Sequence, residues 1–382
     1  MTDREVEKPL AGTRVVEIGT SVAGPYASWI LATLGADVIK VERPGSGDDA
    51  RHWGGLFADG SSSTFHYLNN EKSSITIDMR NEEERSWLHQ FCVSEVDVVI
   101  QNLRPGNVDK YELGSDALRA ENPRLIYCNL WPYGNTGPLK DKPGYDPLMQ
   151  AFSGMMSVTG EVGRPPVRVG PSIIDMGTGM WCAIGILAAL KARQETGVGC
   201  VVDASLYETA IGWMSNPATL AQAIGKSPGR QGTTVSGMAP YQGYECSDGY
   251  LIIAAPNDVL FIKLSTVLGH PDWIKEDCFS NNITRFENVE ALNALMEPIL
   301  LTRSCEHWRS KLDDAGVPSA PVRDTCEMMS DEQTKALGIL QQLEGEAPLQ
   351  ISLPLSFDNV RPKLRRIAPA LGQHNAEIKG SE

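Results

Sequence analysis

The chain has 382 residues, more than one ordinary hydrophobic core requires, so we expect two domains. Its composition, 42 % hydrophobic and 21 % charged residues, is typical of a soluble globular protein, and we identify no segment as long as a membrane span. The formal net charge of −14 argues against nucleic acid or an anionic membrane as a general partner, so a polyanionic ligand would need a local basic patch.

Predicted strands and helices alternate along the first part of the chain. After a polar N-terminus (MTDREVEKPL) that lacks the apolar core of a signal peptide, which predicts a cytoplasmic protein, residues 13–19 (TRVVEIG) form the first expected strand. SVAGPYASWILATLGADVIKVER then predicts a loop, a helix and a second strand, and further strands are expected at 73–79, 96–102 and 124–130. This alternation predicts an α/β fold with a Rossmann-like parallel sheet, whose ligand crevice lies at the carboxyl ends of the strands.

The helix predicted from Asp175 to about Arg193 is apolar on all sides, so we expect it to be buried on most of them, with Gly197 ending it. Later segments combine a hairpin (YQGYECSDGYLIIAA) with helices. We therefore expect four parts, namely a large domain, a linker helix, a small α+β domain and a C-terminal return to the large domain, at 1–200, 201–225, 226–325 and 326–382.

Basic residues follow several of the predicted strands. They lie in KVERPGSGDDARHWG, NNEKSS and QNLRPGNVDK and are Lys40, Arg43, Arg51, Lys72, Arg104 and Lys110. Three basic segments in an acidic protein indicate a phosphate-rich ligand, although a solvated turn explains the first of them about equally well. There is no GxGxxG after the first strand and no GxxxxGK[ST], so an NAD or ATP site loses its main support.

Metal chemistry also has little support in the sequence. The eight cysteines are scattered without a CxxC pair, and the six histidines form no HxxxH or HExxH arrangement. We expect reduced cysteines, no metal and no cofactor.

Two aspartates are predicted to open helices. Asp146, in GYDPLMQAFSG, is a natural N-cap, and its neighbour Tyr145 is either a pocket hydrogen-bond donor or a packed aromatic residue. Asp175, in IIDMGTG, could likewise be a cap, but the helix dipole would also hold its carboxylate ionised, and the glycines would let a substrate come close. An ionised, partly desolvated carboxylate is what a covalent nucleophile must be, and the pattern leaves both roles open.

Taken together, these segments resemble the family III CoA-transferases over nearly the whole chain. The resemblance runs through LAGTRVVEIG, SVAGPYAS, LGADVIKVERPGSGDDAR, NNEKSSI, NLRPGNVDKYELG, RLIYCNL, YGNTGP, GYDPLMQAFSGMMSVTG, IIDMGTGM and LGQHNAEI. It implies a homodimer of two subunits interlinked like rings, with an acyl-CoA and a carboxylic acid as its substrates. By this resemblance Asp175 is the nucleophile, which forms a mixed anhydride and then an aspartyl-CoA thioester.

The resemblance also assigns binding residues. Arg43 matches an arginine that contacts the CoA nucleotide, while Lys72, Asn102, Arg104 and Lys110 lie in segments that look like the rest of the CoA cleft. The closest likeness is to members that act on dicarboxylic acids such as succinate and glutarate. Arg168, just before the nucleophile motif, is our candidate for holding a second carboxylate, and a surface role explains it about as well.

Two alternatives remain open from the sequence. In the related α-methylacyl-CoA racemases a histidine stands where this chain has Tyr145, and a phenol with a pKa of about 10 is a poor base near neutrality, which favours transfer over racemisation. A CoA-binding protein without turnover is the second alternative. Formyl and oxalate chemistry is disfavoured, because GTTVSGMAPYQG replaces a tetraglycine loop and Val22 replaces a glutamine.

Overall fold

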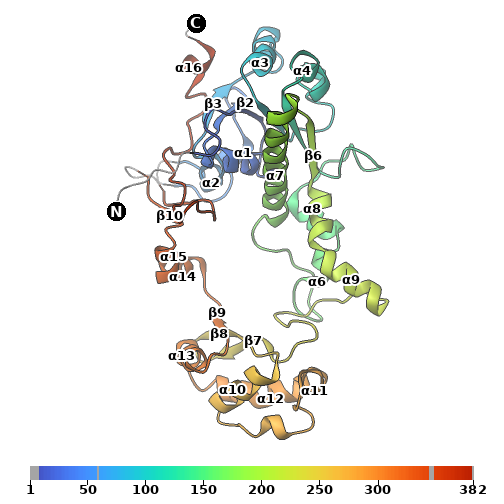
Figure 1. The fold of residues 1–382 in the computed structure, drawn as a ribbon, viewed down its shortest axis with the longest axis vertical. Coiled ribbons are helices and arrows are strands. Elements are labelled where there is room, and N and C mark those ends of the chain that lie inside the picture. Colours follow the sequence, from blue (N-terminus) through green and yellow to red (C-terminus); the bar gives the residue numbers. More distant parts are fainter. Residues whose placement is uncertain (1–7, 58–59, 344–347, 381–382) are drawn as a thin grey trace. The chain divides into compact units, whose positions relative to one another are not determined.

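The computed structural model describes residues 8–57, 60–343 and 348–380; most of the polar N-terminal stretch lies outside them. Its central feature is a six-stranded, wholly parallel sheet with the order β3-β2-β1-β4-β5-β6 (Figure 1). The strands are β1 (Arg14–Ile18), β2 (Asp37–Glu42), β3 (Ser73–Thr76), β4 (Val98–Gln101), β5 (Ile126–Trp131) and β6 (Val201–Ser205). This order is that of doubly wound Rossmann-like sheets, and it confirms the predicted α/β fold.

Helices cover both faces of the sheet because alternate strand residues are apolar on each side. Val15 and Val98 belong to the core that packs against α1 (Ala23–Thr33) and α7 (Ile173–Thr196). Their neighbours Val16 and Val99 belong to a second core, on the side of α3 (Glu82–Ser94) and α4 (Ser115–Glu121). The strand order reverses between β1 and β4, so the switch point lies where loops leave these two strands.

Helix α7 differs from its prediction on its outer side. It ends at Gly197, in a left-handed conformation (φ +73°), as expected, but Met180, Trp181 and Ile184 are about half exposed within the chain. This apolar helix therefore buries only part of its circumference against the rest of the chain. With 24 residues and a window of mean hydropathy 1.7, α7 is also long and apolar enough to cross a membrane, which corrects the expectation that no segment is. Because its other side packs in the core, this is weak support for a membrane span.

The chain divides into two compact units. Unit 1 comprises residues 1–155, 168–223 and 332–382, and unit 2 comprises residues 156–167 and 224–331. These bounds differ from the predicted ones, because residues 156–167 cluster with unit 2. The predicted linker helix at 201–225 is wrong in its first part: the alternating residues VVDAS form β6, and two separate helices follow, α8 (Leu206–Trp213) and α9 (Ser215–Ile224).

Unit 2 is built on a three-stranded antiparallel sheet with the order β7-β8-β9. Its strands are β7 (Tyr241–Cys246), β8 (Gly249–Ala254) and β9 (Ser319–Pro321), and its helices are α10 (Asp258–Val267), α11 (Asn282–Glu287), α12 (Val289–Leu300), α13 (Cys305–Ala315) and α14 (Thr325–Ser330). The remaining α-helices and strands of the described residues are α2 (Ser63–Asn69), α5 (Asp146–Phe152), α6 (Met155–Val158), α15 (Glu332–Ala336), β10 (Leu340–Gln341), β11 (Gln350–Ile351) and α16 (Asn375–Lys379).

The C-terminal segment covers one edge of the large sheet, at β3. The backbone N–H of Ser74 donates to His374 Nδ1 at 3.1 Å, and the N–H of Thr76 donates to Asn375 Oδ1 at 2.9 Å, both on the edge strand β3. Covering an edge strand in this way satisfies donors that would otherwise be free to pair with another chain.

Candidate functional site

A cleft of about 560 Å³ opens at the carboxyl ends of β1 to β4, within unit 1. Gly19 and Thr20 line it after β1, Arg43 and Gly47 line it after β2, and Asn107 lies beyond β4. This is the end at which doubly wound sheets bind ligands. The Arg43 guanidinium is half exposed and pairs with Asp49, so this predicted site residue lies on the cleft and is accessible.

Lys72, a predicted ligand contact, and Lys40, of the first basic segment, do not lie open to the cleft. Both ammonium groups are fully buried and converge on Glu17, with Lys40 Nζ 2.6 Å from Oε1 and Lys72 Nζ 2.8 Å from Oε2. Lys72 Nζ also donates to Pro25 O at 2.8 Å and Asn69 Oδ1 at 2.9 Å. Its three protons are thus engaged inside the protein, which corrects its assignment to the ligand cleft. The basic segments suggested a ligand contact because their acidic partner, Glu17, lies among apolar residues in VVEI, where it was not recognised as a partner.

The charged groups of this cluster change one another's pKa values. Although burial opposes ionisation, the two lysines lower the pKa of Glu17 to about 2. Burial is the main reason that the pKa of Lys72 falls to about 8, and Glu17 offsets part of this fall. Arg51, the third basic residue of the first segment, is bound to Glu42 through Nε at 2.8 Å and through a terminal nitrogen at 2.7 Å. A buried cluster of paired charges thus lies beneath the cleft.

Asn102, which follows β4, binds the backbone of the loop that follows β1. Its Nδ2 donates to Thr20 O at 2.7 Å, and its Oδ1 accepts from Thr20 N at 2.9 Å. The predicted site residue Asn102 thus holds the first loop in place. Arg104 and Lys110, farther along the same segment, have exposed side chains, as expected for residues that meet a ligand or solvent.

The start of α7 is capped by a residue from another helix. Asp146 is buried at the start of α5, and its Oδ2 accepts from the N–H groups of Ile174 and Asp175 at 2.7 and 3.2 Å. Its Oδ1 accepts from Gln150 Nε2 at 2.5 Å. The prediction that Asp146 caps its own helix is therefore wrong, and so is the alternative that Asp175 is the cap of α7.

The Asp175 carboxylate lies half-buried in the first turn of α7, and within the described residues no hydrogen bond to it is found. Burial raises its pKa to about 7, and the neighbouring Asp146 carboxylate adds to the rise. This corrects the expectation that the helix start keeps Asp175 ionised, because the first-turn amides of Ile174 and Asp175 are already bound to Asp146. At neutral pH the group is poised between its two protonation states.

Tyr67 of α2 is a site residue that the sequence did not predict. Burial, with contributions from Asp175 and Tyr26, raises the pKa of its phenol to about 12, so both of these side chains lie within electrostatic reach of Tyr67. The phenol therefore stays protonated across the physiological range and can donate a hydrogen bond. Nothing in the pattern around Tyr67 distinguishes it from a packing residue.

The glycines after Asp175 allow close helix packing. A Cβ at Gly177 would lie 2.8 Å from the Trp213 ring, and one at Gly179 would lie 2.8 Å from Ala23 O and 3.0 Å from Ala27 N of α1. The MGTG motif thus lets α1 and α8 approach α7, whereas we predicted that it makes room for a substrate.

Tyr145 and Arg168, the remaining predicted residues, are both exposed. The Tyr145 side chain is 59 % exposed at the N-cap position of α5. The Arg168 guanidinium donates to Val169 O at 3.0 Å and to Gly170 O, within its own turn. Among the described residues, no group of three or more His, Cys, Asp or Glu side chains is placed to hold a metal ion, and all eight cysteines are free.

Comparisons with known proteins place this site in a family. The structure is similar to that of a CAIB/BAIF family protein from Brucella suis, with a TM-score of 0.90 and 40% identity over 97% of this chain and 98% of that one. Two enzymes are each 34% identical to this chain, over 99% of this chain and 97% of their own. They are the succinate–glutarate CoA-transferase of Agrobacterium fabrum and the acetyl-CoA:oxalate CoA-transferase of Acetobacter aceti. These relatives define the class of protein, an enzyme that transfers coenzyme A.

The model of CoA-transferase family III matches residues 10–375, and the chain belongs to this family. Its resemblance to the family, stated from the sequence, is thereby confirmed. The two named relatives are equally similar to the chain although one carries glutarate and the other oxalate in its name. Overall similarity therefore does not rank these acids as acceptors.

Proposed function

We propose that this CoA-transferase moves CoA from an acyl-CoA donor such as succinyl-CoA to a small dicarboxylic acid, through a thioester on Asp175. The observation that carries the proposal is the state of Asp175. Its carboxylate is half-buried and accepts no hydrogen bond within the described residues. Burial and Asp146 raise its pKa to about 7, and the Tyr67 phenol lies within electrostatic reach. A structural cap would be ionised and bound to amides, whereas a nucleophile must have its oxygens free.

The steps balance without a cofactor. The Asp175 carboxylate attacks the acyl carbonyl of the donor, the C–S bond breaks, and a mixed anhydride and the CoA thiolate form. The thiolate attacks the aspartyl carbonyl, which releases the donor acid as its carboxylate and leaves the aspartyl-CoA thioester. The acceptor carboxylate then repeats the two steps in reverse and regenerates Asp175. We propose that no metal or further cofactor takes part.

Arg43 is the candidate for binding the CoA nucleotide, because its guanidinium is accessible on the cleft at the carboxyl ends of the strands. Arg104 and Lys110, with exposed side chains, are candidates for further phosphate contacts, and Tyr145 and Arg168 for contacts with the acids. The acceptor class rests on the names of the relatives, since glutarate and oxalate are both dicarboxylates.

We further propose a cytoplasmic homodimer. Three large apolar side chains of α7 are about half exposed, and Ile211 and Trp213 of α8 add to them, so unit 1 carries apolar surface that a second subunit would cover.

The test is steady-state transfer from succinyl-CoA to glutarate, oxalate and a monocarboxylate. We expect new acyl-CoA with glutarate and little with oxalate, whose chemistry the loop sequence disfavours, and a loss of at least about a thousandfold in kcat for Asp175→Asn, which keeps the shape but cannot form the anhydride. Arg168→Ala is expected to raise the KM for dicarboxylates and not for the monocarboxylate.

Other outcomes would overturn the proposal. Absence of transfer with every donor, together with CoA binding, would favour a protein without turnover. Exchange of an α-proton of a 2-methylacyl-CoA in deuterated water would instead favour the racemase alternative.

A further inference from the structure

The first loop of the large sheet, residues 19–22, is held by side chains from other parts of unit 1. Lys40 Nζ donates to Gly19 O at 3.0 Å, Asn102 binds both polar backbone groups of Thr20, and Asp48 Oδ1 accepts from Ser21 N at 3.0 Å. Three successive residues of the loop are therefore each fixed through their backbone, by β2, by the segment after β2 and by the segment after β4.

The loop is held in a conformation that it would not adopt freely. Ser21 has φ +70°, in the left-handed region that disfavours residues with a Cβ. Such a conformation is strained and persists only where the surroundings fix it. The bond from Ser21 N to Asp48 supplies that fixation.

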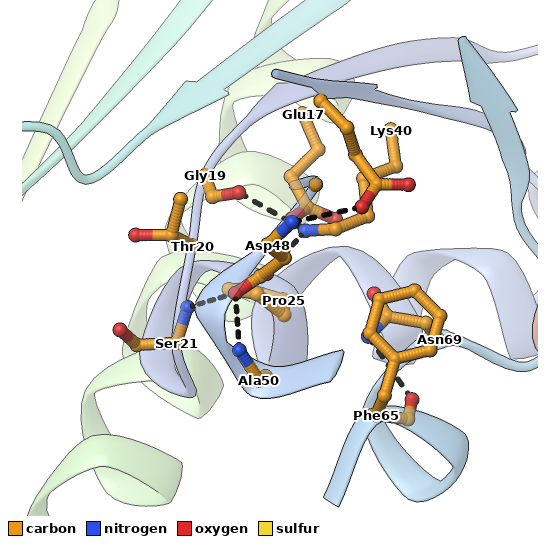
Figure 2. A network of polar contacts seen from close by, with 12 residues as sticks. Glu17, Gly19, Thr20, Ser21, Pro25, Lys40, Asp48, Ala50, Phe65 and Asn69 are labelled. Carbon is orange, nitrogen blue, oxygen red and sulfur yellow. Dashed lines mark hydrogen bonds and ion pairs between the residues drawn. The ribbon is translucent and has the colours of Figure 1, made fainter. Parts of the chain in front are cut away.

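Two of the residues that hold the loop, Asp48 and Lys40, are themselves held by buried charges. Figure 2 shows Asp48 with one oxygen facing the amides of Ser21 and Ala50, while its other oxygen lies 2.8 Å from the Lys40 ammonium. Lys40 is bound in turn to Glu17, and all three charged side chains are fully buried. A ligand in the cleft cannot reach these groups, so they can act on it only through the backbone that they hold.

Gly19 and Thr20 of this loop line the cleft at the switch point of the sheet, as does the turn at residues 47–49. We propose that Lys40, Asp48 and Asn102 are positioning residues that hold the loop 19–22 in its CoA-binding conformation before the ligand arrives. The inference rests on the proposed function in taking CoA as the ligand of this cleft. A loop that is fixed in advance loses less conformational entropy when CoA binds. The apparent Kd for CoA rises as the fraction of molecules with the loop in its binding conformation falls.

The test measures the binding of free CoA by calorimetry, alongside kcat. Asp48→Ala removes the bond to Ser21, and Asn102→Ala removes both bonds to Thr20. We expect each to raise the Kd for CoA about tenfold, the scale of one or two lost buried hydrogen bonds, with kcat at saturating donor changed by less than about threefold. The KM for the acceptor acid is expected to stay unchanged.

Ser28→Ala is the matched control. Ser28 is fully buried and donates to Glu17 Oε2 at 2.6 Å, so its removal disturbs the same charged cluster without touching the loop. We expect a similar loss of thermal stability and an unchanged Kd. If Ser28→Ala raised the Kd for CoA as much as Asp48→Ala does, Asp48 would contribute only general stability, and the proposal would be overturned. An unchanged Kd in both Asp48→Ala and Asn102→Ala would also overturn it.

A measurement on the unchanged protein covers the case in which the variants do not fold. Hydrogen exchange resolved at Ser21 is expected to show its amide protected in the free protein, with little further protection when CoA is added. Fast exchange that slows only with CoA would mean that the ligand orders the loop, and would contradict the inference. Failure of the proposed transfer would appear separately, as absent turnover in the unchanged protein.

Discussion

The role that we propose for Asp175 needs an ionised carboxylate, whereas the surroundings of this side chain disfavour its charge. Its pKa is raised from 3.8 to about 7, first by burial and then by Asp146. A raised pKa lowers the ionised fraction at neutrality but makes the carboxylate that does form a better nucleophile. The phenol of Tyr67 lies within electrostatic reach of Asp175 and stays protonated across the physiological range.

The first prediction concerns pH. Because attack requires the ionised carboxylate, the rate of the first half-reaction with succinyl-CoA should rise with pH and reach half its maximum near pH 7. Rapid-mixing kinetics from pH 5 to pH 9 would measure this. A rate that is flat down to pH 5 would mean that Asp175 keeps an ordinary pKa and that burial does not control its ionisation.

The second prediction concerns stability. Since the folded pKa of Asp175 lies above the unfolded value, the unfolded chain binds fewer protons between about pH 4 and pH 7, and this group lowers the free energy of unfolding as pH rises. Asp175→Asn should therefore stabilise the protein by about 2–4 kcal/mol at pH 8 and have little effect near pH 4. Denaturant titrations at the two pH values measure the difference. An equal effect at both would rule out titration of Asp175 as its cause.

At the scale of elements, the start of α7 depends on a cap from α5. Asp146→Ala leaves the buried amides of Ile174 and Asp175 without their acceptor and should cost about 1–2 kcal/mol. Asp146→Asn retains an oxygen for these amides and should cost less. Both remove a negative charge, so both should move the pH profile of the first half-reaction to lower pH. A shift in only the alanine variant would point to altered backbone geometry in place of lost charge.

The packing of α7 on α1 gives a second prediction at this scale. Gly179→Ala places a Cβ 2.8 Å from Ala23 O, so the helices must separate, and we expect a loss of about 1–3 kcal/mol. Gly212→Ala in α8 is the matched control, because nothing lies within 4 Å of its Cβ, and it should be neutral or stabilising by up to about 1 kcal/mol. Thermal melts compare the two. Equal melting temperatures would show that the helices repack without cost.

At the scale of the whole molecule, the sequence predicted the sheet better than the site. Strands such as TRVVEIG are short runs rich in β-branched residues, so their burial could be predicted locally although charged residues interrupt the apolar pattern. Strand β6 was assigned to a helix, because its short VVDAS run precedes a long helical stretch. The strand order depends on contacts between distant segments, which periodicity does not report.

The site shows the same limit. Asp175 could be singled out because a carboxylate opens an apolar helix, but its cap lies 29 positions earlier and becomes its neighbour only in the fold. Lys72 was predicted to meet the ligand and Lys40 was placed at a ligand-binding turn, whereas Glu17, which binds both, lies within a buried strand. Charge along a sequence indicates where cations occur, and only the fold shows which of them are already paired.

The most direct test of the proposed mechanism is the covalent intermediate. The protein is incubated with succinyl-CoA without acceptor, quenched in acid and digested, and the peptide containing Asp175 is examined by mass spectrometry. We predict that this peptide gains the mass of CoA less one water, that added glutarate removes the adduct, and that Asp175→Asn never forms it. Transfer at an undiminished rate in the Asp175→Asn variant, or an adduct on a peptide other than that of Asp175, would contradict the mechanism.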